Sequence, residues 1–243
     1  MRTKKSIHIG TSGWHYDHWK GPFYPKGMKA EDMLTFYKDR LESVEINNSF
    51  YQLPEEKVLA EWRDTVPEGF VFAAKASRYI THMKKLKDPE EPVSNFIDRM
   101  SVLDDKLGPI LFQLPPHWKL NAKRLQSFCE ALPGGYRYAF EFRDPSWFEK
   151  AVYEILSDHD AAFCIYELSG TLAPRKVTAD FVYVRLHGPE GAYEGDYNRQ
   201  TLAGWAGAFS TWSRKSLDIY CYFDNDHKGY AARNALSLLR MLR

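Results

Sequence analysis

Residues 181–188 read FVYVRLHG, an apolar strand that carries two polar side chains near its carboxyl end. Side chains alternate between the two faces of a strand, so Arg185 and His187 share one face while Val184 and Leu186 share the other. A strand that is buried on both faces normally reads as an unbroken apolar run, because a buried charge is costly unless another group pairs with it. Polar side chains at the carboxyl end of an apolar strand therefore indicate a site that is built where the strand ends.

The same pattern recurs along the chain, in VEINNSFY (44–51), FVFAAKAS (70–77), PILFQLPP (109–116), YAFEFRD (138–144) and DIYCYFDND (218–226). With the apolar segments 7–13 and 161–167 this gives eight strands, most of them followed by a helical segment. We expect a closed eight-stranded parallel (β/α)8 barrel of the TIM type, because closure leaves no strand edge unpaired. The segment 168–180 is too broken by Gly and Pro for a full helix, so the sixth helical segment is expected to be irregular.

The length and the first loop support one barrel. The chain has 243 residues, close to the roughly 250 that are typical of this fold, and no linker interrupts it, so residues 1–243 are expected to form a single domain. An open doubly wound sheet is the alternative, but it would carry a glycine fingerprint after the first strand, and IGTSGWHYDHW is not one.

Composition excludes several classes of protein. The 33 basic and 32 acidic residues give a net charge of +1, so no overall field attracts nucleic acid. The basic run MKKLK (83–87) is a local candidate, although a solvated loop explains it as well. Three widely spaced cysteines form no disulfide or metal pattern, and no apolar stretch suits a signal peptide or membrane span, so a cytoplasmic protein is expected. No nucleotide-binding motif is present.

The polar strand ends predict an acid/base site at the carboxyl-end mouth of the barrel. Glu45 and Glu141 are expected to act as general acid and general base. Close carboxylates in a partly dry site acquire different pKa values, so one can donate a proton while the other accepts one. His187 can move protons near neutral pH, and Lys75 can pair with an anion or, with a lowered pKa, form a Schiff base. The alternative is a buried ion-pair network that holds the barrel layers in register.

The expected ligand-binding residues lie at strand ends or directly behind them. The two arginines have the fork geometry that suits a carboxylate or phosphate. The full set is Trp14, Asn47, Tyr51, His82, Gln113, Arg143, Arg185, Asp224 and Asn225. Trp14, with Trp19, Phe23 and Tyr24, forms either a stacking platform or the packing of a long loop. A divalent metal among His82, Glu45, Glu141, His187 and Asp224 is conceivable but not favoured, since no spacing motif demands it, so no metal ligand is assigned and the cofactor stays unknown.

A family resemblance rests on GTSGWHYDHWKGPFYP (10–25), VEINNSFYQLP (44–54), FAAKASRYITH (72–82), LGPILFQLPP (107–116), EFRDPSW (141–147), YVRLHG (183–188) and YFDNDHKGYAARNA (222–235). Together these segments resemble the YecE-like domain-of-unknown-function 72 family over almost the whole chain. The resemblance implies a β/α-barrel fold and no established activity. Likeness of fold to endonuclease IV suggests nucleic-acid binding by analogy alone. This chain carries mainly Glu, Lys and Arg where those sites carry several His.

The sequence thus favours an enzyme, of hydrolase or lyase type, that performs acid/base chemistry on a small polar or anionic substrate at the barrel mouth. One alternative is a nucleic-acid binding or processing protein that uses the 78–87 loop, and another is a non-catalytic barrel that binds a ligand or partner. No membrane partner is expected, and the oligomeric state is not set by the sequence.

Overall fold

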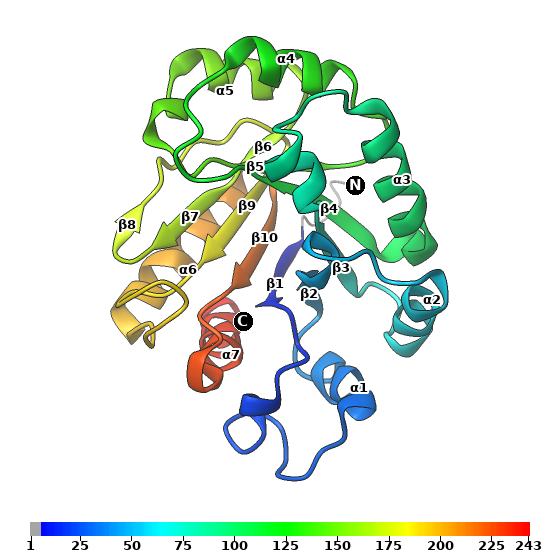
Figure 1. Ribbon diagram of the computed structural model, residues 1–243. Helices are drawn as coiled ribbons and strands as arrows, with labels where there is room; N and C mark the ends of the chain where they lie inside the picture. Colours follow the sequence, from blue (N-terminus) through cyan, green and yellow to red (C-terminus); the bar gives the residue numbers. More distant parts are fainter. Residues whose placement is uncertain (1–5) are drawn as a thin grey trace.

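A computed structural model describes residues 6–243 of the chain, and it contains one twisted ten-stranded sheet surrounded by helices (Figure 1). The strands are β1 (Ile7–Ser12), β2 (Ser43–Ile46), β3 (Val71–Lys75), β4 (Leu107–Gln113), β5 (Tyr138–Glu141), β6 (Ala162–Phe163), β7 (Ile165–Leu168), β8 (Thr171–Leu172), β9 (Phe181–Leu186) and β10 (Asp218–Phe223). Their hydrogen-bonded order is β6-β5-β4-β3-β2-β1-β10-β9-β7-β8.

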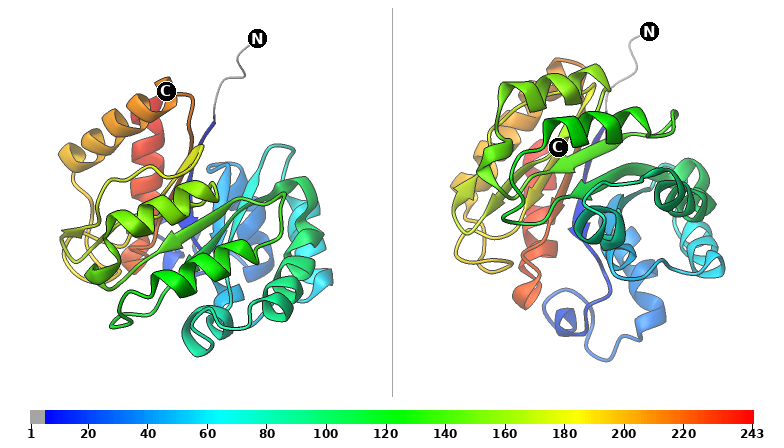
Figure 2. Two further views of the ribbon diagram at one scale, coloured as in Figure 1. Left: turned by 90° about the horizontal axis from the view of Figure 1, so that it is seen from above. Right: turned by 45° about the horizontal axis from the view of Figure 1, so that its top comes forward.

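The helices lie outside the sheet, as the two further views make clear (Figure 2). They are α1 (Met33–Lys38), α2 (Glu56–Thr65), α3 (Glu90–Met100), α4 (Ala122–Glu130), α5 (Lys150–Asp158), α6 (Arg199–Arg214) and α7 (Tyr230–Leu242). Short 3-10 turns η1 (Asp17–Trp19), η2 (Ala30–Asp32), η3 (Asn48–Phe50), η5 (Ser101–Lys106), η6 (Pro145–Trp147) and η7 (His227–Gly229) and one π-helix, η4 (Tyr79–Met83), occupy the connections. The 78–87 loop, which the sequence offers for nucleic-acid binding, therefore contains a turn of π-helix.

The prediction of a closed barrel of eight parallel strands is wrong. The described residues form ten strands, β8 pairs antiparallel with β7, and the hydrogen-bonded order has two ends, β6 and β8. The cause lies in the segment expected as one strand over 161–167, which is divided at Cys164. Its first part, β6, pairs with β5, whereas its second part, β7, pairs with β9. The fold is therefore TIM-like but open.

The segment expected to hold an irregular sixth helix contains no helix. The chain turns at Ser169 and Gly170, both at positive φ, and returns as β8 against the end of β7. Such a turn ends a strand at once and allows a hairpin, which explains why an antiparallel strand enters an otherwise parallel sheet.

Two apolar regions flank the sheet. The larger fills the space between strands and helices and is rich in aromatic rings, for example Phe112, Phe128 and Phe140. The smaller occupies the inner face and combines small side chains such as Ala73 and Ala139 with tyrosines such as Tyr183. The inner face thus leaves room at the strand ends for polar side chains.

Over the described part of the chain, no helix combines the length and apolar character that crossing a bilayer requires.

Candidate functional site

Arg185 is the centre of a buried ionic cluster at the carboxyl ends of the strands. It lies on β9, and its side chain has no exposed surface. Its guanidinium pairs with Glu45 at 2.8 Å, with Glu141 at 2.9 Å and with Asp224 at 2.8 Å. These carboxylates come from β2, β5 and the residue after β10, so one arginine joins four strands that lie far apart in the sequence. The strand-end polar groups do converge, as the alternation of faces indicates.

Each carboxylate has a further partner. The hydroxyls of Ser12 and Tyr183 donate to Glu45, at 2.5 and 2.7 Å. Arg143 donates to Glu141 through Nε. Because an ionised carboxylate accepts several hydrogen bonds, these contacts saturate the cluster. Ser12 and Tyr183 were not among the predicted site residues, although Tyr183 lies two positions before Arg185 and therefore on the same face of the strand.

His187 is held in one tautomer by its neighbours. Its Nε2 lies 3.1 Å from Nη2 of Arg143 and 3.3 Å from Nη1 of Arg185. Arginine nitrogens only donate, so Nε2 accepts and the ring proton sits on Nδ1, which lies 3.0 Å from Asp224. His187 has no exposed surface. Its ring therefore links the arginines to Asp224 inside the cluster.

The arginines control the charge of the buried acids. Burial by itself would raise the pKa of Glu141, but the positive charges of Arg143 and Arg185 outweigh it and hold that pKa well below its usual range. The pKa of Asp224 is lowered as well, because Arg185 and His187 overcome the effect of its burial. These two carboxylates are therefore firmly ionised at neutral pH.

Lys75 differs from every other member of the cluster. It ends β3 and is only 7% exposed, yet its ammonium group makes no ion pair or hydrogen bond within the part of the chain that the structure describes. Instead, Nζ lies 4.5 Å from the centre of the Phe50 ring. Burial, together with the charge of Arg185, lowers the pKa of Lys75 to about 8. Of the four side chains predicted to carry chemistry, Glu45, Glu141 and His187 are locked in place, and Lys75 is free.

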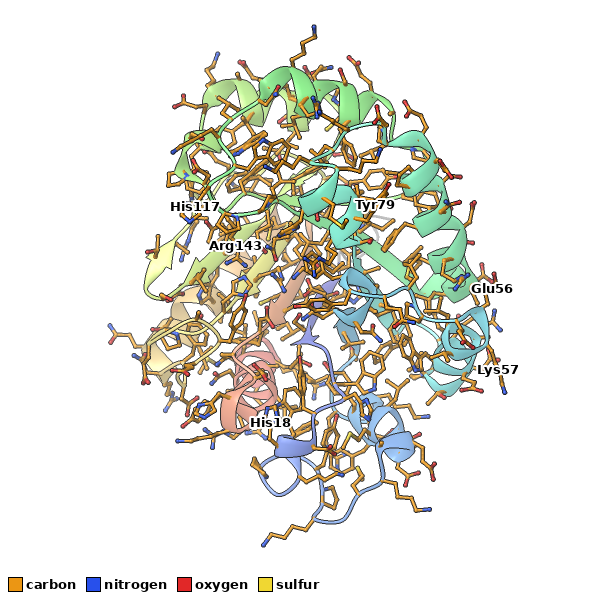
Figure 3. The ribbon with its side chains drawn as sticks, in the orientation of Figure 1. His18, Glu56, Lys57, Tyr79, His117 and Arg143 are labelled. Carbon is orange, nitrogen blue, oxygen red and sulfur yellow. The ribbon has the colours of Figure 1, made fainter. Side chains whose placement is uncertain are left out.

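Other predicted residues border the same region. Arg143, on the segment that follows β5, keeps 9% of its side chain exposed and lies over the ring of Tyr166 at 5.0 Å. In Figure 3 Arg143 lies near the middle of the view, across from the π-helix that carries Tyr79. His82 of that π-helix is half-buried against Phe50. Its pKa is lowered to about 4 by burial and by the positive charges of Lys75, Arg78 and Arg143. Gln113 ends β4 in register with Glu141.

Three predicted residues belong to a neighbouring pocket instead. Trp14, Asn47 and Tyr51 line a hollow of about 620 Å³ between the loop after β1 and helix α2. Asn225 lies elsewhere, since it is fully buried and its Nδ2 donates to the carbonyl of Gly195 and to Asn234. Asn225 therefore fastens the loop after β9 to α7. The sequence alone gave no signal that separated these residues from the ionic cluster.

The structure also bears on the role of the aromatic loop and on the hypothesis of a divalent metal site. Trp19 and Tyr24 are buried and pack on each other, so packing is the reading that the structure supports for them. Among residues 6–243, no group of three or more His, Cys, Asp or Glu side chains is arranged to hold a metal ion. The carboxylates that could have done so are directed at Arg185 instead.

Comparison with known proteins places the chain in a family. Residues 8–243 match the family model described as protein of unknown function DUF72. The UPF0759 protein YunF of Bacillus subtilis is 28% identical over 97% of this chain and 94% of its own length. A DUF72 family protein of Thermotoga maritima has a crystal structure with a TM-score of 0.88 and 30% identity, covering 98% of this chain and 99% of that one. A DUF72 family protein of Enterococcus faecalis has a TM-score of 0.82 and 21% identity, over 97% of this chain and 95% of that one. The chain therefore belongs to the DUF72 family.

Proposed function

We propose that this protein is an enzyme that performs proton-transfer chemistry on a small polar substrate bearing an anionic group, bound beside Lys75 and Arg143 at the carboxyl ends of the strands. The single observation that carries this proposal is the side chain of Lys75, which is only 7% exposed and whose ammonium group lacks a counter-ion among the described residues. An unpaired buried charge destabilises the fold, and proteins that retain one usually use it.

The contrast with the rest of the cluster strengthens this argument. Arg185 is surrounded by three carboxylates and has no exposed surface, which leaves it nothing to offer a ligand. Lys75 lies beside the same group of charges but pairs with none of them. A substrate carboxylate or phosphate would supply the missing partner, and the partly exposed guanidinium of Arg143 could contact the same anion.

The pKa of Lys75 supports a role in proton transfer as well as in binding. With a pKa of about 8, roughly a tenth of the amine is deprotonated at pH 7, so both forms are available near neutral pH. His82, whose pKa is about 4, is an uncharged ring beside it and can accept or donate a hydrogen bond. In this proposal Glu45, Glu141, Asp224 and His187 hold the two arginines in position rather than touching the substrate.

A binding experiment tests the proposal. Inorganic phosphate is titrated into the wild-type protein and followed by calorimetry and by amide chemical shifts. We expect binding that is lost in Lys75→Met and that weakens as the pH rises through about 8, because the ammonium loses its proton. Lys57→Met, at an exposed position on α2 (Figure 3), is the matched control and should bind phosphate as the wild type does. Equal phosphate binding by wild type and Lys75→Met would overturn the anion site.

The enzymatic part needs its own measurement. Wild type and Lys75→Met are each incubated with a small-molecule extract of cells, and the extracts are compared by mass spectrometry. We expect an anionic compound that is consumed by the wild type and not by the variant. Consumption by both proteins, or by neither, would remove the catalytic proposal while leaving the binding result intact.

A second candidate is nucleic-acid binding, which one observation favours. Lys84, Lys85, Lys87 and Arg124 gather around a shallow hollow of about 430 Å³ next to Trp118. Phosphate contacts by such a patch would weaken steeply with salt. Retention of single-stranded DNA or RNA at low salt that is lost in a Lys85→Glu/Lys87→Glu double variant would support this function over the first. For either function we propose a cytoplasmic location, which suits the three free, buried cysteines.

A further inference from the structure

We infer that the pocket beside the ionic cluster is a second subsite, and that it takes an uncharged planar ring bearing an N–H donor. This inference rests on the proposed function and adds to it the class of substrate, a molecule with a ring at one end and an anionic group at the other. Three observations support the inference: the aromatic walls of the pocket, the Oδ1 atom of Asn47, which has no hydrogen-bond partner, and the position of Lys75.

The walls of the pocket suit a flat ring. Trp14 and Trp62 meet edge to face, with ring centroids 4.8 Å apart and planes at 85°. Trp14 is 7% exposed and forms the inner wall, whereas Trp62 on α2 is only partly buried and can offer a ring face. Leu34 and Val58 complete the apolar lining. Aromatic rings gain stacking energy on such surfaces whatever their substituents.

The charges around the pocket exclude an anionic ring. Its lining includes the carboxylates of Glu31 and Glu61 and contains no Lys or Arg. Glu31 pairs with the exposed Lys29 at 3.4 Å, and Glu61 forms no ion pair within the described part of the chain. An anionic ligand would be repelled here and attracted to Lys75, so the two regions differ in the charge they accept.

Asn47 supplies the polar contact. It follows β2 directly, and its Oδ1 atom is shielded from solvent without any hydrogen-bond partner. A buried acceptor without a partner costs free energy, and a ligand N–H in the pocket would satisfy it once the half-buried amide of Asn47 turns its oxygen toward the hollow. Such an acceptor beside the Trp14 and Trp62 rings selects a ring that carries a donor, such as an amide or a nitrogen heterocycle, over a ring that carries none.

The pocket adjoins the proposed anion site. Tyr51, which lines the pocket, is 71% exposed and packs edge to face on Phe50 at 5.0 Å. The ring of Phe50 in turn faces the ammonium group of Lys75 at 4.5 Å. Two aromatic rings therefore separate the subsites, so one small molecule could reach both.

Two neutral probes of the same shape test the subsite without the anion site. Benzamide carries an N–H donor, and methyl benzoate does not. We expect the wild type to bind benzamide at least fivefold more tightly in a titration followed by Trp fluorescence and ligand-observed NMR. Trp62→Ala should weaken benzamide binding roughly tenfold, and Trp62→Phe should restore most of it. Asn47→Ala should bring the two probes to equal affinity, which a purely structural role of Asn47 would not do.

The controls separate this inference from the proposed function. Lys75→Met should bind benzamide as the wild type does, and saturating phosphate should not displace benzamide. Failure of the wild type to bind benzamide, or equal binding of the two probes by the wild type, would overturn the ring subsite and leave phosphate binding at Lys75 untouched. Displacement of benzamide by phosphate would show that the two regions are one site and would also overturn the inference.

Discussion

Replacement of Arg185 by Met tests the central claim about the ionic cluster, that one buried arginine neutralises acids from three other strands. Methionine fills much of the volume of the arginine stem but cannot donate, so Glu45, Glu141 and Asp224 each lose a contact of 2.8 to 2.9 Å. Breaking a buried ion pair typically costs about 3–5 kcal/mol. Glu45 keeps Ser12 and Tyr183, and Glu141 keeps Arg143. We therefore expect a loss of about 3–5 kcal/mol at pH 7 in total, rather than for each acid.

The effect should depend on pH in a definite direction. The pKa values of Glu141 and Asp224 are lowered in the folded wild type, so these groups stabilise it above the pKa of the unfolded chain and lose that contribution as the pH falls through the folded pKa. Without Arg185, burial favours their protonated forms instead. The difference in free energy of unfolding between wild type and Arg185→Met should therefore be smaller at pH 5 than at pH 7.

Urea and thermal unfolding measure this difference. At about 2–4 °C per kcal/mol for a chain of this size, the midpoint should fall by roughly 6–20 °C. Arg233→Met is the matched control, because Arg233 pairs with Asp196 at 2.8 Å but is about half-exposed, and exposed pairs contribute little. A loss below about 1 kcal/mol for Arg185→Met, or the same loss at both pH values, would refute the argument that the cluster is a tightly coupled buried network.

Three further outcomes follow from other residues. The rate at which a dilute acylating reagent modifies Lys75, followed by peptide mass spectrometry, should rise with a midpoint near pH 8; a midpoint above about 10, the ordinary range of a lysine, would contradict the lowered pKa. The ring signals of His82 should titrate near pH 4 and stay constant between pH 6 and 8, and a midpoint above 6 would contradict the effect of burial and of Lys75. Gly188 has a φ of +112°, and a Cβ there would lie 2.1 Å from the carbonyl oxygen of Glu194, so Gly188→Ala should lower the unfolding temperature by several degrees, whereas Gly204→Ala, in open space on α6, should not.

The sequence made a large part of the site predictable. Alternation along strands is a local property, so the shared face of Arg185 and His187 and the polar ends of β2, β3 and β5 could be read directly. Because parallel strands end at one side of a sheet, these residues were expected to meet, and those of β2, β5 and β9 do, whereas Lys75 at the end of β3 contacts Phe50 instead. Ser12 was not predicted, because a serine in GTSG (10–13) has the same local pattern as an ordinary turn residue.

The opening of the sheet was not predictable in the same way. The segment 161–167 reads as one continuous apolar strand, and its division at Cys164 depends on which neighbour lies beside each half. Which strands pair depends on interactions between segments that are distant in the sequence. The local pattern of apolar and polar residues carries little information about these interactions.

Local sequence is enough to tell which polar groups gather at the strand ends, because side-chain alternation and strand direction are properties of each segment alone. How those groups pair depends on the folded sheet. Three acids contact Arg185, Lys75 lies against the ring of Phe50, and Trp14 and Asn47 line a separate pocket. The physical reason is that an ion pair depends on distances of a few ångströms between atoms of different strands, and these are set by the stagger and twist of the whole sheet.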